Sequence, residues 1–342
     1  MGEGLNALEE FNNYKKVINR WYNGKRKILN INTSPYNSLN IFIELLISLI
    51  RENKRILYIS QEKNINKDFL SKIKSRIDKN IKYSFNKEEE KNDITFFSYD
   101  NIFEIKNHYD LCIIDDISNF SLVSKNDLRE YIEYLYIYCS KIIIYSIEKN
   151  IPTGEVLKVV DLNRKKPFVE PRILNTRVNL ENDIPYNLYD YLTWFKENKR
   201  KVVIMIPRDK SINIIFNYYQ NLLGLKDIKV MKFSKGDKDK ELDKFYKEKN
   251  KSIFLITNEI QSFSKVQNYK VELDIILLFS ESIFYNYKKI VYLSSEVGKN
   301  INRNKIGELL LVSKYSSEDM DKSKEITRSY NKELWESGLL KK

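Results

Sequence analysis

The chain has 342 residues, 42% hydrophobic and 31% charged, so it is long enough for two or three domains that each bury a core. Its formal charge of +12 favours anionic partners such as nucleic acid, although a lysine-rich proteome would give many proteins the same charge. Two cysteines, Cys112 and Cys139, exclude a four-cysteine zinc site, and the single histidine, His108, excludes chemistry that needs two. With no bilayer-length apolar run and no signal-peptide pattern, we expect a cytoplasmic protein.

Short apolar runs alternate with amphipathic segments in the first part of the chain. The runs predict strands, and the segments, with their helical spacing of apolar residues, predict helices. Strand, helix, strand in this order implies right-handed crossovers and a parallel sheet covered on both faces. The predicted strands are residues 26–32, 54–60, 94–99, 109–116 and 141–147, and the predicted helices are residues 40–53, 67–79 and 127–140.

The middle of the chain lacks this alternation. Four of the six prolines fall in residues 149–185, and no helical period is visible there. This composition is typical of a segment between domains. We therefore predict an N-terminal domain over residues 1–150, a connector over 151–185 and a C-terminal domain over 186–342.

The alternation resumes after the connector. Two helices are predicted in the first part of this region, and Gly224 is a candidate C-cap for the second of them. A third helix is predicted near the end of the chain. The fold class is therefore α/β, with two mostly parallel sheets that are each flanked by helices. The predicted helices are residues 188–199, 211–224 and about 317–335, and the predicted strands are residues 201–207, 228–233, 252–257, 271–279 and 306–313.

Two aspartates, Asp115 and Asp116, follow the apolar strand of the segment LCIIDDISNF. Ligands bind at the carboxyl ends of strands in open parallel sheets, so this pair is either the metal-holding acid of a nucleotide hydrolase or the polar end of a buried strand. Residues 31–38, INTSPYNS, follow the first strand, at the place where such an enzyme has its phosphate loop. That loop needs small residues with free backbone amides, then a lysine and a hydroxyl. Pro35 has no amide to offer, so this segment alone does not predict a phosphate loop.

Taken in order along nearly the whole chain, these segments resemble the late-competence DNA-uptake helicase family, ComFA, within helicase superfamily 2. The TGAGKT-like loop of that family falls on Thr33–Ser38 without a gap, and its helix continues into residues that match Ile41 and Phe42. Other first-domain segments of the family resemble residues 55–62, 111–120 and 145–147. Second-domain segments of the family resemble residues 257–266, 291–300, 307–312 and 318–331.

The sequence departs from the family pattern at the positions that handle phosphate. Asn37 stands in place of the loop lysine, and Ser34 and Tyr36 stand in place of glycines. In the second domain, Glu296 and Lys299 stand in place of two arginines that the family directs at the outer phosphate. An arginine of that kind supplies about 10³–10⁵ in rate.

The resemblance implies two RecA-like lobes and remnants of a nucleotide site. The remnant positions are Asp115, Asp116, Glu296 and Lys299, with Asp115 at the metal position and Thr33, Ser34, Asn37 and Ser38 in the phosphate loop. We predict a DNA-associated pseudo-helicase of DNA uptake that works with other DNA-uptake proteins, without ATP turnover and without a cofactor. Two alternatives remain open. One is an active ATP-dependent translocase that uses ATP and Mg²⁺ in a variant site, and the other is an interaction scaffold without DNA or ATP.

Residues 14–27, YKKVINRWYNGKRK, interleave basic and aromatic residues. This mixture suits single-stranded DNA, through attraction to phosphate and stacking on bases. The simpler interpretation, which we favour, is a helix before the first strand with Trp21 in the core and lysines in solvent. The candidate cations are Lys15, Lys16, Arg20, Lys25, Arg26 and Lys27.

Overall fold

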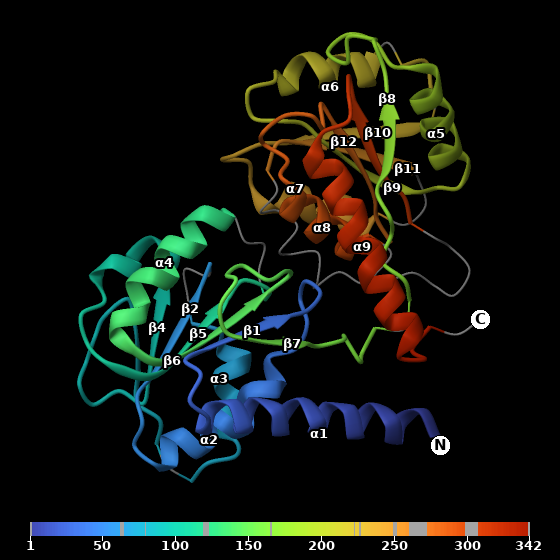
Figure 1. The fold of residues 1–342 in the computed structure, drawn as a ribbon. Helices are drawn as coiled ribbons and strands as arrows, with labels where there is room; N and C mark the ends of the chain where they lie inside the picture. Colours follow the sequence, from blue (N-terminus) through green and yellow to red (C-terminus); the bar gives the residue numbers. More distant parts are fainter. Residues whose placement is uncertain are drawn as a thin grey trace. The chain divides into compact units, whose positions relative to one another are not determined.

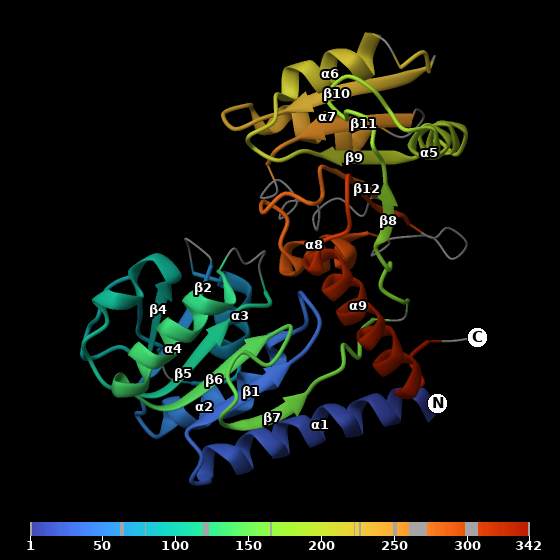
Figure 2. The same ribbon diagram turned by 45° about the horizontal axis from the view of Figure 1, so that its top comes forward.

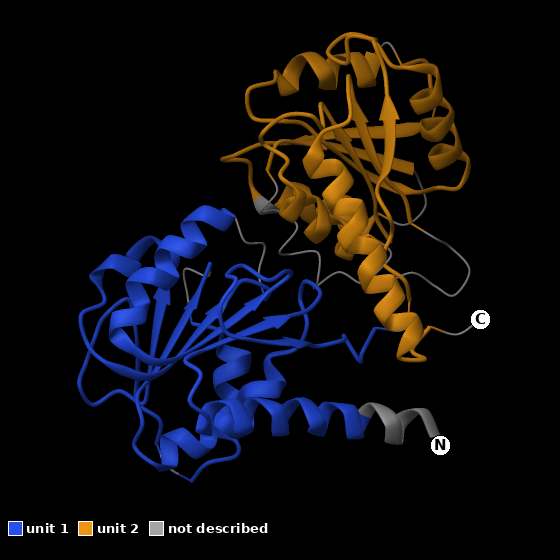
Figure 3. Ribbon diagram, in the orientation of Figure 1, with its two compact units in different colours: residues 1–165 blue, residues 166–342 orange. Residues whose placement is uncertain are grey.

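The structure is a computed structural model of the chain. It describes residues 2–61, 65–78, 80–118, 123–164, 166–221, 223–225, 227–248, 252–259, 272–297 and 307–340, with the backbone alone for residues 2–7 and 239. The chain forms two compact units, residues 1–165 and 166–342 (Figure 3). Each unit is a parallel sheet flanked by helices, which confirms the predicted fold class.

The first unit is built around a sheet with the strand order β3-β4-β2-β5-β6-β1-β7, and every pairing that the structure describes in it is parallel. Helix α4 covers one face, while α1, α2 and α3 lie on the other (Figure 1). The elements are α1 (Gly2–Asn23), β1 (Ile28–Asn32), η1 (Leu39–Phe42), α2 (Ile43–Arg51), β2 (Ile56–Ser60), α3 (Lys67–Lys74), β3 (Tyr83–Phe85), β4 (Ile94–Ser98), η2 (Tyr99–Glu104), β5 (Tyr109–Asp115), α4 (Lys125–Tyr138), β6 (Cys139–Ser146) and β7 (Glu155–Lys158).

The second unit has the strand order β10-β11-β9-β12-β13-β8, again with parallel pairings throughout the described residues. Helices α5 and α6 pack on one face, and α7, α8 and α9 lie on the other (Figure 2). The elements are β8 (Arg172–Asn175), α5 (Tyr186–Glu197), β9 (Lys201–Met205), α6 (Ile212–Asn221), β10 (Ile228–Phe233), α7 (Asp239–Lys247), β11 (Ser252–Thr257), β12 (Asp274–Leu278), α8 (Tyr287–Glu296), β13 (Leu309–Ser313) and α9 (Glu318–Glu336).

Side-chain caps determine where several helices begin. Asn66 accepts the Phe69 N–H at 3.0 Å before α3, and Asn286 accepts the Lys289 N–H at 2.9 Å before α8. Helix α4 begins with a reciprocal capping box: the Ser124 hydroxyl accepts the backbone N–H of Asp127, whose carboxylate accepts that of Ser124. Such caps satisfy the first backbone donors of a helix and stabilise it by about 1 kcal/mol each.

The predicted connector contains regular structure. Strand β7 pairs with β1 and completes the first sheet, and β8 pairs with β13 and completes the second. The boundary between the compact units lies between residues 165 and 166, inside the predicted connector. Both strands are short and half-exposed, so they carry little of the apolar signal by which a strand is recognised in sequence. No helix in the described part of the chain is long and apolar enough to cross a membrane.

A buried ion pair joins two strands of the second unit. Arg200, directly before β9, donates two hydrogen bonds of 2.6 and 2.7 Å to the carboxylate of Asp274, the first residue of β12. Asp274 also accepts the backbone N–H of Glu308 at 2.8 Å, which ties in the segment before β13. The side chains of Arg200 and Asp274 are 4% and 1% exposed, so neither charge is solvated by water.

We expect Asp274→Ala to lower the free energy of unfolding by about 3–5 kcal/mol, because it removes the carboxylate that accepts two hydrogen bonds from the buried Arg200 guanidinium. Urea unfolding followed by tryptophan fluorescence measures this change. The matched control is Glu272→Ala, which removes a carboxylate 3.9 Å from Arg200 that is itself 27% exposed. The control should cost less than about 1 kcal/mol. Equal losses in the two variants would contradict a dominant role for the buried pair.

Candidate functional site

The loops that follow β1, β5 and β6 meet at the carboxyl edge of the first sheet, where open parallel sheets bind ligands. The Tyr36 N–H donates to the Ile117 carbonyl at 2.9 Å, which joins the loop after β1 to the turn after β5. The Asp116 N–H donates to the Tyr145 carbonyl, and the Thr33 N–H donates to the Ser146 carbonyl. The structure therefore brings the predicted phosphate-loop and acidic residues of the first unit together.

Asp115, the last residue of β5, is 3% exposed, and its carboxylate is engaged by its own neighbourhood. One oxygen, Oδ1, accepts the backbone N–H groups of Ile117 and Ser118, each at 3.0 Å. The other, Oδ2, accepts a short hydrogen bond from the Tyr58 hydroxyl of β2, the adjacent strand. Both oxygens therefore hold the turn and the sheet together, as expected for a structural carboxylate.

Burial raises the pKa of Asp115 above its ordinary value of 3.8. The groups that oppose this shift are hydrogen-bond donors: the side chains of Ser118 and Tyr58 and two backbone N–H groups. Burial also raises the pKa of Tyr99 and of Tyr145, and the charge of Asp115 adds to the shift in both. Asp115 thus lies among phenol groups, and donors rather than cations stabilise its charge.

The backbone amides of residues 33–40 are largely paired within the chain. Besides Thr33 and Tyr36, the Asn37 N–H points at the Ser34 carbonyl at 3.4 Å. The Ser38 N–H donates to Asn37 Oδ1 at 2.6 Å, and the Asn40 N–H donates to Ser38 Oγ at 3.2 Å. The last contact is the N-cap of η1, the short 3₁₀ segment that leads into α2. These donors are the type of group that a phosphate loop directs at its ligand.

The side chains of this loop also turn inward. Asn37, at the position of the family lysine, donates from Nδ2 to Thr33 Oγ1 at 2.7 Å and is 8% exposed. Tyr36 has a φ of +62°, the left-handed conformation that favours glycine, so the loop keeps a glycine-like backbone without a glycine. The Ser34 hydroxyl is buried and makes no hydrogen bond within the described residues.

These residues do not fit Mg²⁺ with a nucleoside triphosphate. No lysine stands at the position of the outer phosphates, Pro35 lacks an amide, and the neighbouring amides already have acceptors. The hydroxyl of Ser38, at the family's metal position, caps η1, and both oxygens of Asp115 accept donors from the chain. A metal ion would have to compete with these donors.

In the second unit, Glu296 is the last residue of α8 and is 4% exposed. The position predicted to carry a second phosphate-sensing residue, Lys299, lies outside the described residues. So do residues 260–266 and 298–300 of the family-like segments. The structure thus places a buried acid at the first of the two arginine positions and describes no geometry for the second.

The basic residues of segment 14–27 are divided between α1 and the loop after it. Trp21 and Tyr14 are buried, at 1% and 6% exposure, so their rings are not available to stack on bases. Three of the cations already contact the protein. Lys15 pairs with Glu44 at 2.5 Å, Arg26 lies 3.9 Å from Glu155, and Lys27 donates to the Tyr136 carbonyl at 2.6 Å. The exposed cations for which the described structure shows no ion-pair partner are Lys16, Arg20 and Lys25.

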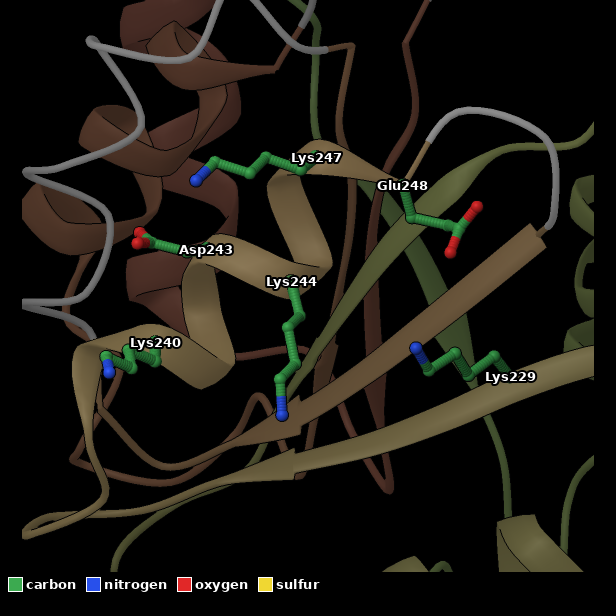
Figure 4. Close-up of a pocket in the computed structure, with 6 residues that line it drawn as sticks. All are labelled: Lys229, Lys240, Asp243, Lys244, Lys247 and Glu248. Carbon is green, nitrogen blue, oxygen red and sulfur yellow. The ribbon is translucent and has the colours of Figure 1, made fainter.

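An open pocket of the second unit is rich in lysine (Figure 4). It is lined by Lys229, near the start of β10, and by residues along α7 and directly after it. Its cations are partly neutralised, because two acids line the same pocket and Lys244 pairs with Glu241 at 2.7 Å. The lining residues are Lys229, Lys240, Asp243, Lys244, Lys247 and Glu248.

The tyrosines around Asp115 were not predicted as part of the site from the sequence. Tyr58 is one of many tyrosines in the chain, and its role depends on β2 lying beside β5 with Ser60 opposite Asp115. The sequence offered only a weak signal, because Tyr58 lies near the carboxyl end of a predicted strand whose neighbour in the sheet the sequence does not specify. Within the described residues, no three histidine, cysteine or acidic side chains come together as metal ligands would.

No protein-family model matches the sequence, and no curated protein sequence matches it. Solved structures do match the fold. The E. coli DExH-box NTPase HrpB aligns with a TM-score of 0.54 and 9% identity over 88% of this chain and 42% of its own. A second structure, of the Escherichia coli DEAH/RHA helicase HrpB, aligns with a TM-score of 0.50 and 9% identity over 91% and 43%. The NS3-like helicase from Alongshan virus aligns with a TM-score of 0.49 and 9% identity over 84% and 73%.

The chain therefore shares with HrpB a fold of two RecA-like units, each a parallel sheet flanked by helices. The alignment with HrpB extends over most of the chain, so it includes both units. The chain spans less than half the length of the HrpB chains that it matches. At 9% identity the likeness concerns the fold alone.

We expect the stability of the wild-type protein to fall, relative to an Asp115→Asn variant, as the pH rises through the folded-state pKa of Asp115. The folded-state pKa is raised, so the folded protein retains the proton where the unfolded chain has lost it. That contribution is fully present below the unfolded-state pKa and disappears above the folded one. Urea unfolding at a series of pH values from about 4 to about 8 measures the difference. Glu90→Gln, at an exposed loop acid, is the control, and a pH-independent difference between wild type and Asp115→Asn would contradict the prediction.

Proposed function

We propose that this protein is a superfamily 2 helicase-like protein that associates with DNA and does not turn over ATP. One observation carries the proposal. A nucleotide hydrolase directs its loop amides at phosphate and its acidic residue at a metal ion, whereas here the loop amides donate to acceptors of the chain and the Asp115 carboxylate accepts from donors of the chain. Hydrolysis needs these groups preorganised toward the ligand. In this chain a ligand would first have to break several hydrogen bonds.

The finer identity that we propose is a divergent relative of the ComFA helicases of DNA uptake. The support is the order of family-like segments along both units, from the loop at 33–38 to the helix at 318–331. The helicase-like fold is compatible with this relation, and HrpB shares that fold. In this role the protein would contribute a DNA-binding or complex-forming surface to DNA uptake, alongside other proteins of the same process.

The net charge of +12 supports an association with DNA. The exposed cations Lys16, Arg20 and Lys25 form one candidate contact with the phosphate backbone, and the lysine-lined pocket of the second unit forms another. We favour the first, because these three residues have no acid paired with them in the described structure, whereas two acids line the pocket.

We expect millimolar ATP with Mg²⁺ to leave the melting temperature of the purified protein unchanged, with or without single-stranded DNA. A ligand at a hundredfold excess over its dissociation constant would stabilise the folded state by about 2.7 kcal/mol, which thermal unfolding readily detects. Mg²⁺ alone and adenosine with Mg²⁺ are the matched ligand controls. A stabilisation specific to ATP that Asp115→Asn removes would contradict the proposal, because it would show that the acidic position still holds a metal-bound nucleotide.

We expect single-stranded DNA to bind at low salt and to dissociate steeply as salt is added. Each phosphate contact contributes about 0.7 to the slope of log affinity against log salt concentration for single strands. The triple variant Lys16→Glu, Arg20→Glu and Lys25→Glu should therefore reduce both the affinity and the slope. Fluorescence anisotropy of a labelled oligonucleotide across a salt series measures both.

The matched control makes the same charge change at the pocket, with Lys240→Glu, Lys244→Glu and Lys247→Glu. A loss of affinity in this variant alone would move the DNA site to the second unit and overturn the assignment to α1. A wild-type protein that binds no DNA at low salt would overturn the proposed association with DNA and favour an interaction scaffold.

A further inference from the structure

The outer surface of α4 carries a cluster of aromatic rings together with η2, the short helix before β5. Phe103 packs edge-on against Tyr131 and Tyr134, with ring centroids 5.7 and 5.1 Å apart. Tyr134 in turn contacts Tyr138 at 5.1 Å, and Tyr131 stacks on the buried Tyr99 at 5.8 Å. We call Phe103, Tyr131, Tyr134, Ile137 and Tyr138, with the nearby acids Asp100, Glu104, Asp127 and Glu130, the aromatic–acidic surface.

The apolar part of this surface faces solvent and is held in place. Phe103 is 51% exposed and Ile137 is 68% exposed. The single proton of the Tyr134 hydroxyl is shared between the carbonyl oxygens of Phe103 and Ile105, at 3.0 and 2.7 Å, which fixes η2 against α4. The helical period places residues 127, 130, 134 and 137 along the same side of α4. The surface is therefore preorganised, so a partner would bind it without ordering it first.

The charge of this surface is opposite to that of the protein. The acids Asp127, Asp100 and Glu130 lie close enough to Tyr131 to raise its pKa, in addition to the effect of burial. The cations of α4 point away from it: Lys125 pairs with Glu148 at 3.5 Å, and Arg129 donates to the Asn150 carbonyl at 3.1 Å. Lys106 adds one positive charge in the loop after η2. An acidic area on a protein with a net charge of +12 would repel nucleic acid.

Cations bind both features that this surface combines. Exposed aromatic rings attract ammonium and guanidinium groups, and nearby carboxylates pair with the same groups. The helix itself carries one such contact on another side, where Lys27 Nζ lies 4.1 Å from the centre of the Tyr136 ring. Phe103 and Ile137 would in addition cover the methylene stems of long basic side chains.

We propose that the aromatic–acidic surface binds a lysine- or arginine-rich segment of a partner protein. Two features support this proposal: the charge complementarity of the acids, and the exposed Phe103 ring held on half-buried tyrosines. Neither feature depends on nucleotide or DNA binding by this chain. The partner segment would place cations over Phe103 and the tyrosine rings and pair them with Glu130 and Asp127.

The test uses the full chain and a fluorescent peptide of alternating arginine and leucine, with a glutamate–leucine peptide of equal length as the reference. We expect the arginine peptide to bind and the glutamate peptide not to bind. Phe103→Ala and Glu130→Lys should each weaken binding about three- to tenfold, as expected for loss of a cation–π contact or an ion pair at an interface. Both positions are exposed, so these variants should keep the fold, which thermal unfolding checks.

Two control variants make equivalent changes elsewhere. Tyr136→Ala removes a ring that is 49% exposed on another side of α4, and Glu325→Lys reverses an exposed charge on α9. We expect both to bind the peptide as wild type does. Equal losses in the controls, equal binding of the two peptides, or no binding would overturn the proposal. Self-association of the chain that Glu130→Lys abolishes would also overturn it, because the occupant would then be a second copy.

Discussion

The carboxylate of Asp115 fixes the turn after β5, and the loop after β1 depends on that turn. Its oxygens accept the N–H groups of Ile117 and Ser118 and the hydroxyl of Tyr58. The Ile117 carbonyl, oriented by this turn, accepts the Tyr36 N–H from the loop. A buried carboxylate is tolerated in a protein core only if it is paired or fully hydrogen-bonded. Here hydrogen-bond donors of the chain stabilise Asp115, as a bound metal ion could otherwise do. The same residues that could serve catalysis therefore serve the stability of the first unit, and the two uses compete.

The sequence predicted the parts of the fold that have a strong local signal. Residues 111–114 form a continuous apolar run, and β5 is buried on both faces there, as such runs are in parallel sheets. Residues 155–158 and 172–175 are half-buried or exposed, so β7 and β8 depend on pairing with β1 and β13 rather than on their own composition. The location of Asp115 at a strand end followed from the order of elements. The contact of Asp115 with Tyr58 could not be predicted from that order, because it requires the register between β2 and β5.

The predicted phosphate loop shows a similar division. The absence of a lysine at Asn37 and of an amide at Pro35 is visible in the sequence. The sequence does not show that the remaining amides are hydrogen-bonded within the chain. Those hydrogen bonds depend on the Asn37 side chain, which turns back to Thr33, and on a carbonyl from another strand. Tyr36 retains the left-handed backbone of a glycine position, at a strain of about 1–3 kcal/mol. The loop thus adopts a backbone conformation that favours glycine with a tyrosine at that position.

The topology of each unit has a consequence for synthesis of the protein. In the first unit, β1 pairs with β6 and β7, so residue 28 meets residue 142 and residue 29 meets residue 155. In the second unit, β8 pairs with β13, so residue 172 meets residue 310. An early strand of each sheet is therefore synthesised before its partner strands, which follow more than a hundred residues later. Until then its edges remain unpaired in the nascent chain. Domains fold as units during translation, and exposed edges of this kind invite aggregation. Chaperone demand of the nascent chain should consequently peak twice, once before each late strand emerges.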